Sequence, residues 1–184
     1  SLSEKVAVDI GSSTGGFTDC LLQHGIEKVF AVDVGYGQLD WKLQSDSRVV
    51  SLDRKNAREL NSSDINELVD LVVIDVSFIS LKIIIPSAIN VLKPVGDLIA
   101  LVKPQFEVGK EKVENKGIIK DPKKHLGVLI ELNSFMKKLG WPITGIATSP
   151  ITGQKGNREF LIHCLRKENS RIIEDDHIRN MINT

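Results

Sequence analysis

The sequence predicts an α/β protein whose mostly parallel, doubly wound sheet carries an antiparallel hairpin at its C-terminal end. Two observations predict this fold class. Short β-branched runs alternate with segments of helical periodicity, which is typical of strand–helix units that build a parallel sheet. The last two strand-like segments, 143–149 and 159–165, are joined by Gly- and Pro-containing turns that are too short for a crossover helix. We therefore expect these two strands to pair antiparallel at the sheet edge.

The first unit is expected to be a strand, a tight turn and a helix. Residues 5–10 (KVAVDI) form a short β-branched run that suits a buried parallel strand. Apolar residues then recur at helical spacing between Phe17 and His24, and Gly25 follows where a helix C-cap is expected.

Further strand signals repeat along the chain. They cover residues 29–34, 49–52, 71–75 and 98–102. Residues 83–92 have the pattern of a helix, which Pro94 and Gly96 are expected to end.

The longest helix is expected to begin at Asp121-Pro122, a favourable pair for the N-cap and the first helical position, and to end at Gly140. Its apolar stripe consists of Leu126, Leu129, Ile130 and Met136. We expect one domain over residues 1–166, followed by a polar tail, residues 167–184, with a short helix.

Composition narrows the class of protein. No apolar run reaches the roughly 18 residues that a membrane helix needs, and the first residues show no secretory signal. Cys20 and Cys164 lie in apolar segments without metal-ligand spacing, so we expect both to be buried, as in a reducing cytoplasm. The four histidines are scattered and predict no metal site. These features predict a cytoplasmic protein without a membrane partner.

The charge is uneven although its net value is zero. The stretch from Lys103 to Lys124 contains seven lysines and four acidic residues, which gives it a local charge of +3. Such a loop attracts phosphates, or it is an ordinary solvated loop, and the charge alone favours neither interpretation.

A glycine-rich turn follows the first strand, and Asp33 ends the second strand about 20 residues later. Glycines let a backbone approach a ligand closely, a helix N-terminus offers free N–H donors, and an acid at this place accepts hydrogen bonds from a ribose diol. The spacing of Gly11, Gly15 and Gly16 does not match a dinucleotide site, and no lysine follows as in a P-loop. An S-adenosylmethionine (SAM) site fits best. The alternative is that the glycines serve only a tight turn.

Five stretches resemble the TlyA family of FtsJ-like rRNA 2′-O-methyltransferases, whose members are also named hemolysins. They are residues 9–19 (DIGSSTGGFTD), 31–39 (AVDVGYGQL), 73–80 (VIDVSFIS), 100–107 (ALVKPQFE) and 156–160 (GNREF). The resemblance runs from about residue 6 to residue 165 and implies a Rossmann-like fold of the class I SAM-dependent methyltransferases. It also implies the set of cofactor-binding residues, namely Asp9, Gly11, Ser12, Ser13, Thr14, Gly15, Gly16, Phe17, Asp33, Asp53 and Asp75.

Asp75, Lys103 and Glu159 are the candidate catalytic residues. Each lies at a predicted strand end or beside it, and the carboxyl ends of parallel strands share one rim. The antiparallel last strand starts at that same rim, so we expect Glu159 to join Asp75 and Lys103 there. The resemblance implies that they are the second to fourth members of a Lys-Asp-Lys-Glu tetrad. An amine placed on a ribose 2′-hydroxyl takes its proton or stabilises the developing alkoxide. The two carboxylates are expected to orient the lysines, and Asp75 is also expected to complement the sulfonium.

The chain departs from the family pattern in two ways. The first lysine of the tetrad has no convincing counterpart, because Lys5 lies too close to the strand start. The S4-like RNA-binding domain that the family carries upstream is also missing from this sequence, and we expect it in a longer chain. The competing functions are a membrane-active hemolysin, a non-catalytic SAM- and RNA-binding protein, and a nicotinamide oxidoreductase, which the glycine spacing disfavours.

Overall fold

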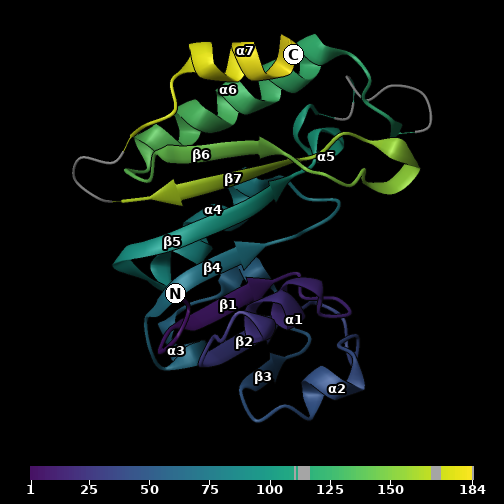
Figure 1. Cartoon of the computed structure of the whole chain (residues 1–184). Helices are drawn as coiled ribbons and strands as arrows, with labels where there is room; N and C mark the ends of the chain where they lie inside the picture. Colours follow the sequence, from purple (N-terminus) through teal and green to yellow (C-terminus); the bar gives the residue numbers. More distant parts are fainter. Residues whose placement is uncertain (110, 112–116, 167–170, 184) are drawn as a thin grey trace. The chain divides into compact units, whose positions relative to one another are not determined.

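The computed structural model describes residues 1–109, 111, 117–166 and 171–183. Its main elements, shown in Figure 1, are β1 (Val6–Ile10), α1 (Gly16–Gln23), β2 (Lys28–Val32), α2 (Trp41–Gln44), β3 (Val49–Leu52), α3 (Ser62–Ile65), β4 (Val69–Ile74), α4 (Leu81–Asn90), β5 (Leu92–Val102), α5 (Pro104–Glu107), α6 (Pro122–Lys138), β6 (Ile143–Thr148), β7 (Phe160–Leu165) and α7 (Asp175–Asn183). The strands follow the hydrogen-bonded order β3-β2-β1-β4-β5-β7-β6 in one sheet of seven. The predicted α/β class is confirmed.

The chain divides into two compact units. The first consists of Ser1–Val76 and Ile83–Leu98, and the second of Ser77–Lys82 and Ile99–Thr184. In the first unit β1 pairs in parallel with β2 and with β4, and β2 pairs in parallel with β3. Val8 and Ile10 of β1 are fully buried, as the β-branched run predicted. The carboxyl ends of these strands therefore point the same way.

The strand β5 begins earlier than predicted. The helix α4 ends at Asn90, and Pro94 and Gly96, which were expected to end it, lie inside the eleven-residue β5 instead. Gly96 is buried, and a Cβ there would lie 2.7 Å from the side chain of Leu92 and 3.1 Å from the backbone oxygen of Asp70. Gly96 thus marks a close approach between strands, a meaning that glycine has within sheets but that local sequence does not reveal.

The second unit contains the predicted hairpin. β6 and β7 pair antiparallel, with Ile146 opposite Ile162. The helix α6 begins where Asp121 and Pro122 predicted it, and the Asp121 side chain accepts a hydrogen bond from the Lys123 amide. Its buried face differs slightly from the prediction. Leu129 and Met136 are buried, Leu126 and Ile130 are only half-buried, and Val128, Leu132 and the polar residues His125 and Asn133 complete the face.

The described part of the tail is docked on α6, and Figure 1 shows α7 lying along it. Ile173, Ile178 and Ile182 are buried. The buried Asn133 amide donates to the Ile173 carbonyl oxygen and to the Asp175 carboxylate, at 3.2 and 2.9 Å. These contacts hold the C-terminal helix to the second unit.

The prediction for the cysteines is half wrong. Cys164 is fully buried, whereas Cys20 is exposed because α1 turns Thr18, Leu21 and Leu22 toward the core.

Within residues 1–109, 111, 117–166 and 171–183, no helix combines the length and apolar character needed to cross a membrane. The same residues contain no group of three or more His, Cys, Asp or Glu side chains placed to hold a metal ion.

Candidate active site

The glycine-rich turn after β1 is held by the neighbouring strands. The amides of Gly11 and Ser12 both donate to the Val32 carbonyl oxygen at the end of β2, at 2.9 and 3.2 Å. Gly11 has φ +80°, and a Cβ at this position would overlap with the backbone oxygen of Asp75. A glycine is therefore required both by the left-handed backbone and by the close approach of Asp75.

The second half of the turn opens α1. Gly15 precedes the helix with φ +103°, and a Cβ there would overlap with the side chain of Leu43 from α2. Gly15 has no side chain to cap this helix end, and the first amides of a helix can donate to a ligand. A Cβ at Gly16 would meet no atom within 4 Å, and Ser13 and Thr14 are exposed. The turn therefore presents open backbone on its outer side.

Asp9 is a buried carboxyl group beneath the turn. It is 1% exposed, and its Oδ2 accepts a 2.7 Å hydrogen bond from the Thr18 hydroxyl. Among the described residues no donor reaches Oδ1. Burial raises the pKa of Asp9 to about 6, opposed by the Thr18 hydrogen bond and assisted by the negative charges of Asp75 and Asp33. Sequence reasoning missed Thr18, although it lies in the motif of residues 9–19.

Asp33 and Asp53 organise the turn after β2. The two carboxylate oxygens of Asp33 accept hydrogen bonds from the Ser13 and Gly35 amides, at 2.9 and 2.7 Å. Asp53 accepts from the Gly37 amide at 3.0 Å and from the Ser51 hydroxyl at 2.8 Å. The Gly37 amide and the Ser51 hydroxyl lower the pKa of Asp53. Each carboxylate has further lone pairs and can accept from a hydroxyl as well.

These residues fit a nucleoside that carries positive charge. Asp33 and Asp53 offer acceptors to a diol and to polar edges, and the open backbone of the turn permits a close approach. The Asp9 oxygen that has no partner among the described residues offers a buried acceptor. Of the remaining predicted members, Ser12 is buried and Phe17 is half-buried. The Asp75 amide donates to Ile10 at 2.9 Å, which fixes its backbone beside β1.

Lys103 lies in the second unit, directly after β5 and at the N-cap of α5. Its Nζ donates a 3.0 Å hydrogen bond to the Ser77 hydroxyl. Ser77 lies two residues after Asp75, within the motif of residues 73–80, yet sequence reasoning assigned it no role. An alternating pattern does not report which side chain a lysine 26 residues later will contact.

Glu159 precedes β7 and is 6% exposed. Its carboxylate packs on Gly153, where a Cβ would overlap with Glu159 Oε1. The turn before it is shaped by Asn157, which is 3% exposed. The Asn157 side chain accepts from the Ile119 amide at 2.9 Å and donates to the Gly117 carbonyl oxygen at 3.0 Å. Sequence reasoning also missed this buried amide.

The predicted residues thus fall into two groups. The turn, Asp9, Asp33, Asp53 and Asp75 belong to the first unit, and Lys103 and Glu159 belong to the second. Convergence of Asp75 with Lys103 and Glu159 stays a prediction. Lys110, Lys112 and Lys116, three of the seven lysines in the positively charged loop between Lys103 and Lys124, lie outside the described residues.

Residues 1–166 match the FtsJ-like methyltransferase family. YqxC, a candidate rRNA methyltransferase of Bacillus subtilis (strain 168), is 51% identical over 164 residues, which are 89% of this chain and 58% of YqxC. The 16S/23S rRNA (cytidine-2′-O)-methyltransferase TlyA of Mycobacterium tuberculosis is 44% identical over 166 residues, which are 90% of this chain and 62% of TlyA. The chain therefore spans about three fifths of the length of these curated relatives.

Solved structures agree with this relationship. The crystal structure of a candidate hemolysin from Lactococcus lactis is 43% identical, with a TM-score of 0.92 over 99% of this chain and 88% of that one. A candidate SAM-dependent methyltransferase from Listeria monocytogenes, at 16% identity, covers 91% of this chain and 93% of its own with a TM-score of 0.67. The second similarity concerns the fold alone, which is Rossmann-like.

Proposed function

Because the chain belongs to the FtsJ-like methyltransferase family, we propose that it transfers a methyl group from SAM to a ribose 2′-hydroxyl of RNA, and that this RNA is ribosomal. The observation that carries the proposal is the Lys103 amine, held by Ser77 at the end of β5, in a chain 44% identical to a relative named as an rRNA 2′-O-methyltransferase. A cytoplasmic location and an S4-like RNA-binding domain in the full-length protein are parts of the same proposal.

The first unit would hold the cofactor. The amides of the turn before α1 would face its carboxylate, Asp33 would accept from the ribose diol, and Asp53 would lie on the adenine side. Asp9 and Asp75 would complement its positive charge, since carboxylates stabilise cations most strongly where water is excluded. When bound, SAM supplies an electrophilic methyl group on a sulfonium.

The second unit would act on the RNA hydroxyl. A ribose 2′-hydroxyl is a poor nucleophile at neutral pH, so its proton must leave as its oxygen attacks. Lys103 can accept that proton only as a neutral amine, because an ammonium group has three donors and no acceptor. As an ammonium it would stabilise the developing alkoxide instead. Glu159, buried against Gly153, would orient the amine.

Replacing Lys103 tests the proposal in the full-length protein. Lys103→Ala should lower methyl transfer to unmodified ribosomal subunits by about 10²–10⁴-fold, the usual contribution of an acid–base group. SAM affinity measured by calorimetry should stay nearly unchanged, because the cofactor residues lie in the first unit. Lys137→Ala is a matched control, since the Lys137 amine pairs with Glu174 in the described part of the chain, on the surface of α6. A Lys103→Ala enzyme that keeps more than about a tenth of wild-type turnover would refute the role.

A further inference from the structure

Two chain segments of the second unit are fastened together along their length. One is the segment 77–82, which leads into the first turn of α4 at Leu81. The other consists of Lys103 and the short helix α5. Lys103 Nζ donates to Ser77 Oγ at 3.0 Å, and the rings of Phe106 and Phe78 lie 5.0 Å apart between centroids. At the far end, the Glu107 carboxylate accepts from the Ser80 hydroxyl at 2.6 Å and from the Leu81 amide at 2.7 Å.

Glu107 does more than cap a helix. The start of α4 already has a local cap, because the Ser80 hydroxyl accepts a hydrogen bond from the Lys82 amide at 3.2 Å. The carboxylate of Glu107 reaches this place from 26 residues away in the sequence. Hydrogen bonds to a carboxylate are shorter and roughly twice as strong as neutral ones, and the distances to Ser80 and Leu81 are in that range.

The helix α5 transmits this attachment to Lys103. It is a single turn, with Lys103 at its N-cap and Glu107 as its last residue, and Pro104 stiffens its start. The Phe106 amide donates to the Lys103 carbonyl oxygen at 2.9 Å. Because Lys103 directly precedes this single turn, fixing the Glu107 end also fixes the backbone from which the Lys103 side chain starts.

The partner segment needs such support. Phe78 has φ +65°, a left-handed conformation that strains an L-residue, and the residue is 84% exposed. A strained backbone of this kind persists when surrounding contacts impose it, and it is common at functional sites. Glu107 supplies two hydrogen bonds that hold the segment directly after Phe78.

We propose that Glu107 is a positioning residue, which sets the amine of Lys103 by fastening α5 to the segment that carries Ser77. This inference rests on the proposed function, in which Lys103 acts on the RNA hydroxyl. A small displacement of a catalytic group can cost about 10²-fold in rate without weakening substrate binding. Loss of the attachment should therefore lower kcat and leave both KM values nearly unchanged.

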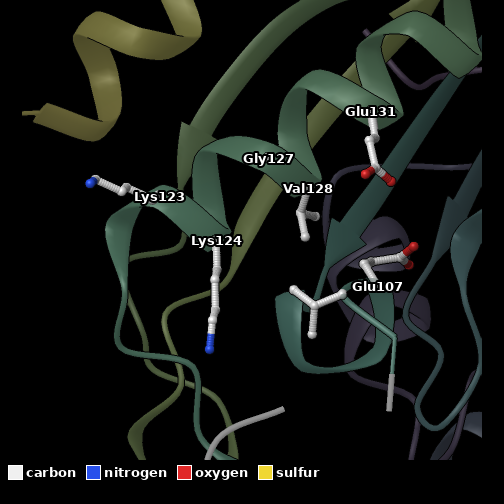
Figure 2. A pocket seen from close by; sticks show the side chains of 7 residues that line it. Glu107, Lys123, Lys124, Gly127, Val128 and Glu131 are labelled. Carbon is white, nitrogen blue, oxygen red and sulfur yellow. The ribbon is translucent and has the colours of Figure 1, made fainter. Parts of the chain in front are cut away.

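A neighbouring glutamate offers a matched control. Glu107 and Glu131 line one pocket of about 230 Å³ together with Val108, Lys123, Lys124, Gly127 and Val128, and Figure 2 shows both carboxylates on the same side of it. Glu131 pairs with Lys82 at 3.2 Å and is largely exposed. Removal of Glu131 changes the charge of the same pocket and removes only an exposed ion pair to Lys82, which contributes little, while the attachment of Glu107 to Ser80 and Leu81 stays in place.

The experiment compares Glu107→Ala, Glu107→Gln, Ser80→Ala and Glu131→Ala in the full-length protein, with methyl transfer to unmodified ribosomal subunits as the first readout. Glu107→Ala should lower kcat by about 10–100-fold. Glu107→Gln should stay within about threefold of wild type, since its amide can still accept from Leu81 and donate to the Ser80 oxygen. Ser80→Ala removes one of the two bonds and should give a smaller loss, which keeps the test decisive if Glu107→Ala does not fold. Glu131→Ala should resemble wild type.

A second readout does not depend on methyl transfer. The rate of acetic anhydride labelling at Lys103, followed by mass spectrometry across pH, should change by about threefold or more in Glu107→Ala, while labelling of Lys137 should not. Unchanged kcat and unchanged Lys103 labelling in both Glu107→Ala and Ser80→Ala would overturn the positioning role. A wild-type protein that transfers no methyl group would overturn the proposed function instead, and the labelling would then decide the role of Glu107 alone.

Discussion

The buried carboxyl of Asp9 predicts a conflict between stability and cofactor binding. Its pKa is raised from 3.8 to about 6 by burial. The folded protein therefore binds this proton more tightly than the unfolded chain, so the contribution of Asp9 to stability falls as pH rises from about 4 to about 6 and stays low above. A pKa that is higher by roughly two units, at 1.36 kcal/mol each, lowers the free energy of unfolding above about pH 6 by about 3 kcal/mol.

Asp9→Asn removes the cost of burying a charged carboxylate at neutral pH. Its side-chain oxygen can still accept from the Thr18 hydroxyl, while its new amide group faces the place where Oδ1 has no donor among the described residues. An unmatched amide costs about 1–2 kcal/mol, so the net gain in unfolding free energy at about pH 7.5 should be about 1–2 kcal/mol. At about pH 4 the wild-type group is protonated too, and the gain should vanish or reverse.

Urea unfolding of wild type and Asp9→Asn between about pH 4 and pH 7.5 measures this difference. The change of the difference with pH, about 3 kcal/mol, is the quantity to test, because the unmatched amide contributes equally at each pH. Asp19→Asn is the control, since Asp19 is exposed on α1 and its carboxylate bonds only to Gln23 among the contacts that the structure describes. A difference that stays constant across this range would show that Asp9 does not titrate there.

Three further predictions follow from the same geometry. SAM affinity should fall up to about tenfold per pH unit as pH drops below about 6, because Asp9 loses its charge, and calorimetry on Asp9→Asn should give a flat profile. Asp33→Ala should weaken SAM binding by about 1.5–3 kcal/mol through loss of charged hydrogen bonds, and equal affinities would remove Asp33 from the ribose role. Asn157→Ala should lower the unfolding free energy by about 2–4 kcal/mol, because the Ile119 amide and the Gly117 carbonyl lose their partner. Thermal unfolding measures this loss, and a change below about 0.5 kcal/mol would contradict it.

Much of the fold was predictable because its signals are local. The run at residues 5–10, the Asp121-Pro122 start of α6 and the antiparallel pairing of β6 with β7 all depend on neighbours in the sequence, and all three were confirmed. The errors have the opposite cause. Pro94 and Gly96 were interpreted as helix breakers. They lie inside β5 instead, where Gly96 packs closely against the backbone of Asp70. Cys20 was expected to be buried, but the orientation of α1 turned it outward.

The same division holds at the candidate site. Local patterns were enough to indicate a glycine turn, an acid at the next strand end and a lysine after β5, because chemistry of this kind needs those residue types at those places. Only the folded chain decided why each is there. Gly11 must be glycine because the backbone oxygen of Asp75 lies where a Cβ would be. The pKa of Asp9 is raised because the core buries its carboxyl group. Lys103 bonds to Ser77 because Glu107 binds the segment that follows Ser77. Each of these depends on residues brought together from distant parts of the chain, and a hydrophobic period of two or 3.6 residues carries no record of such partners.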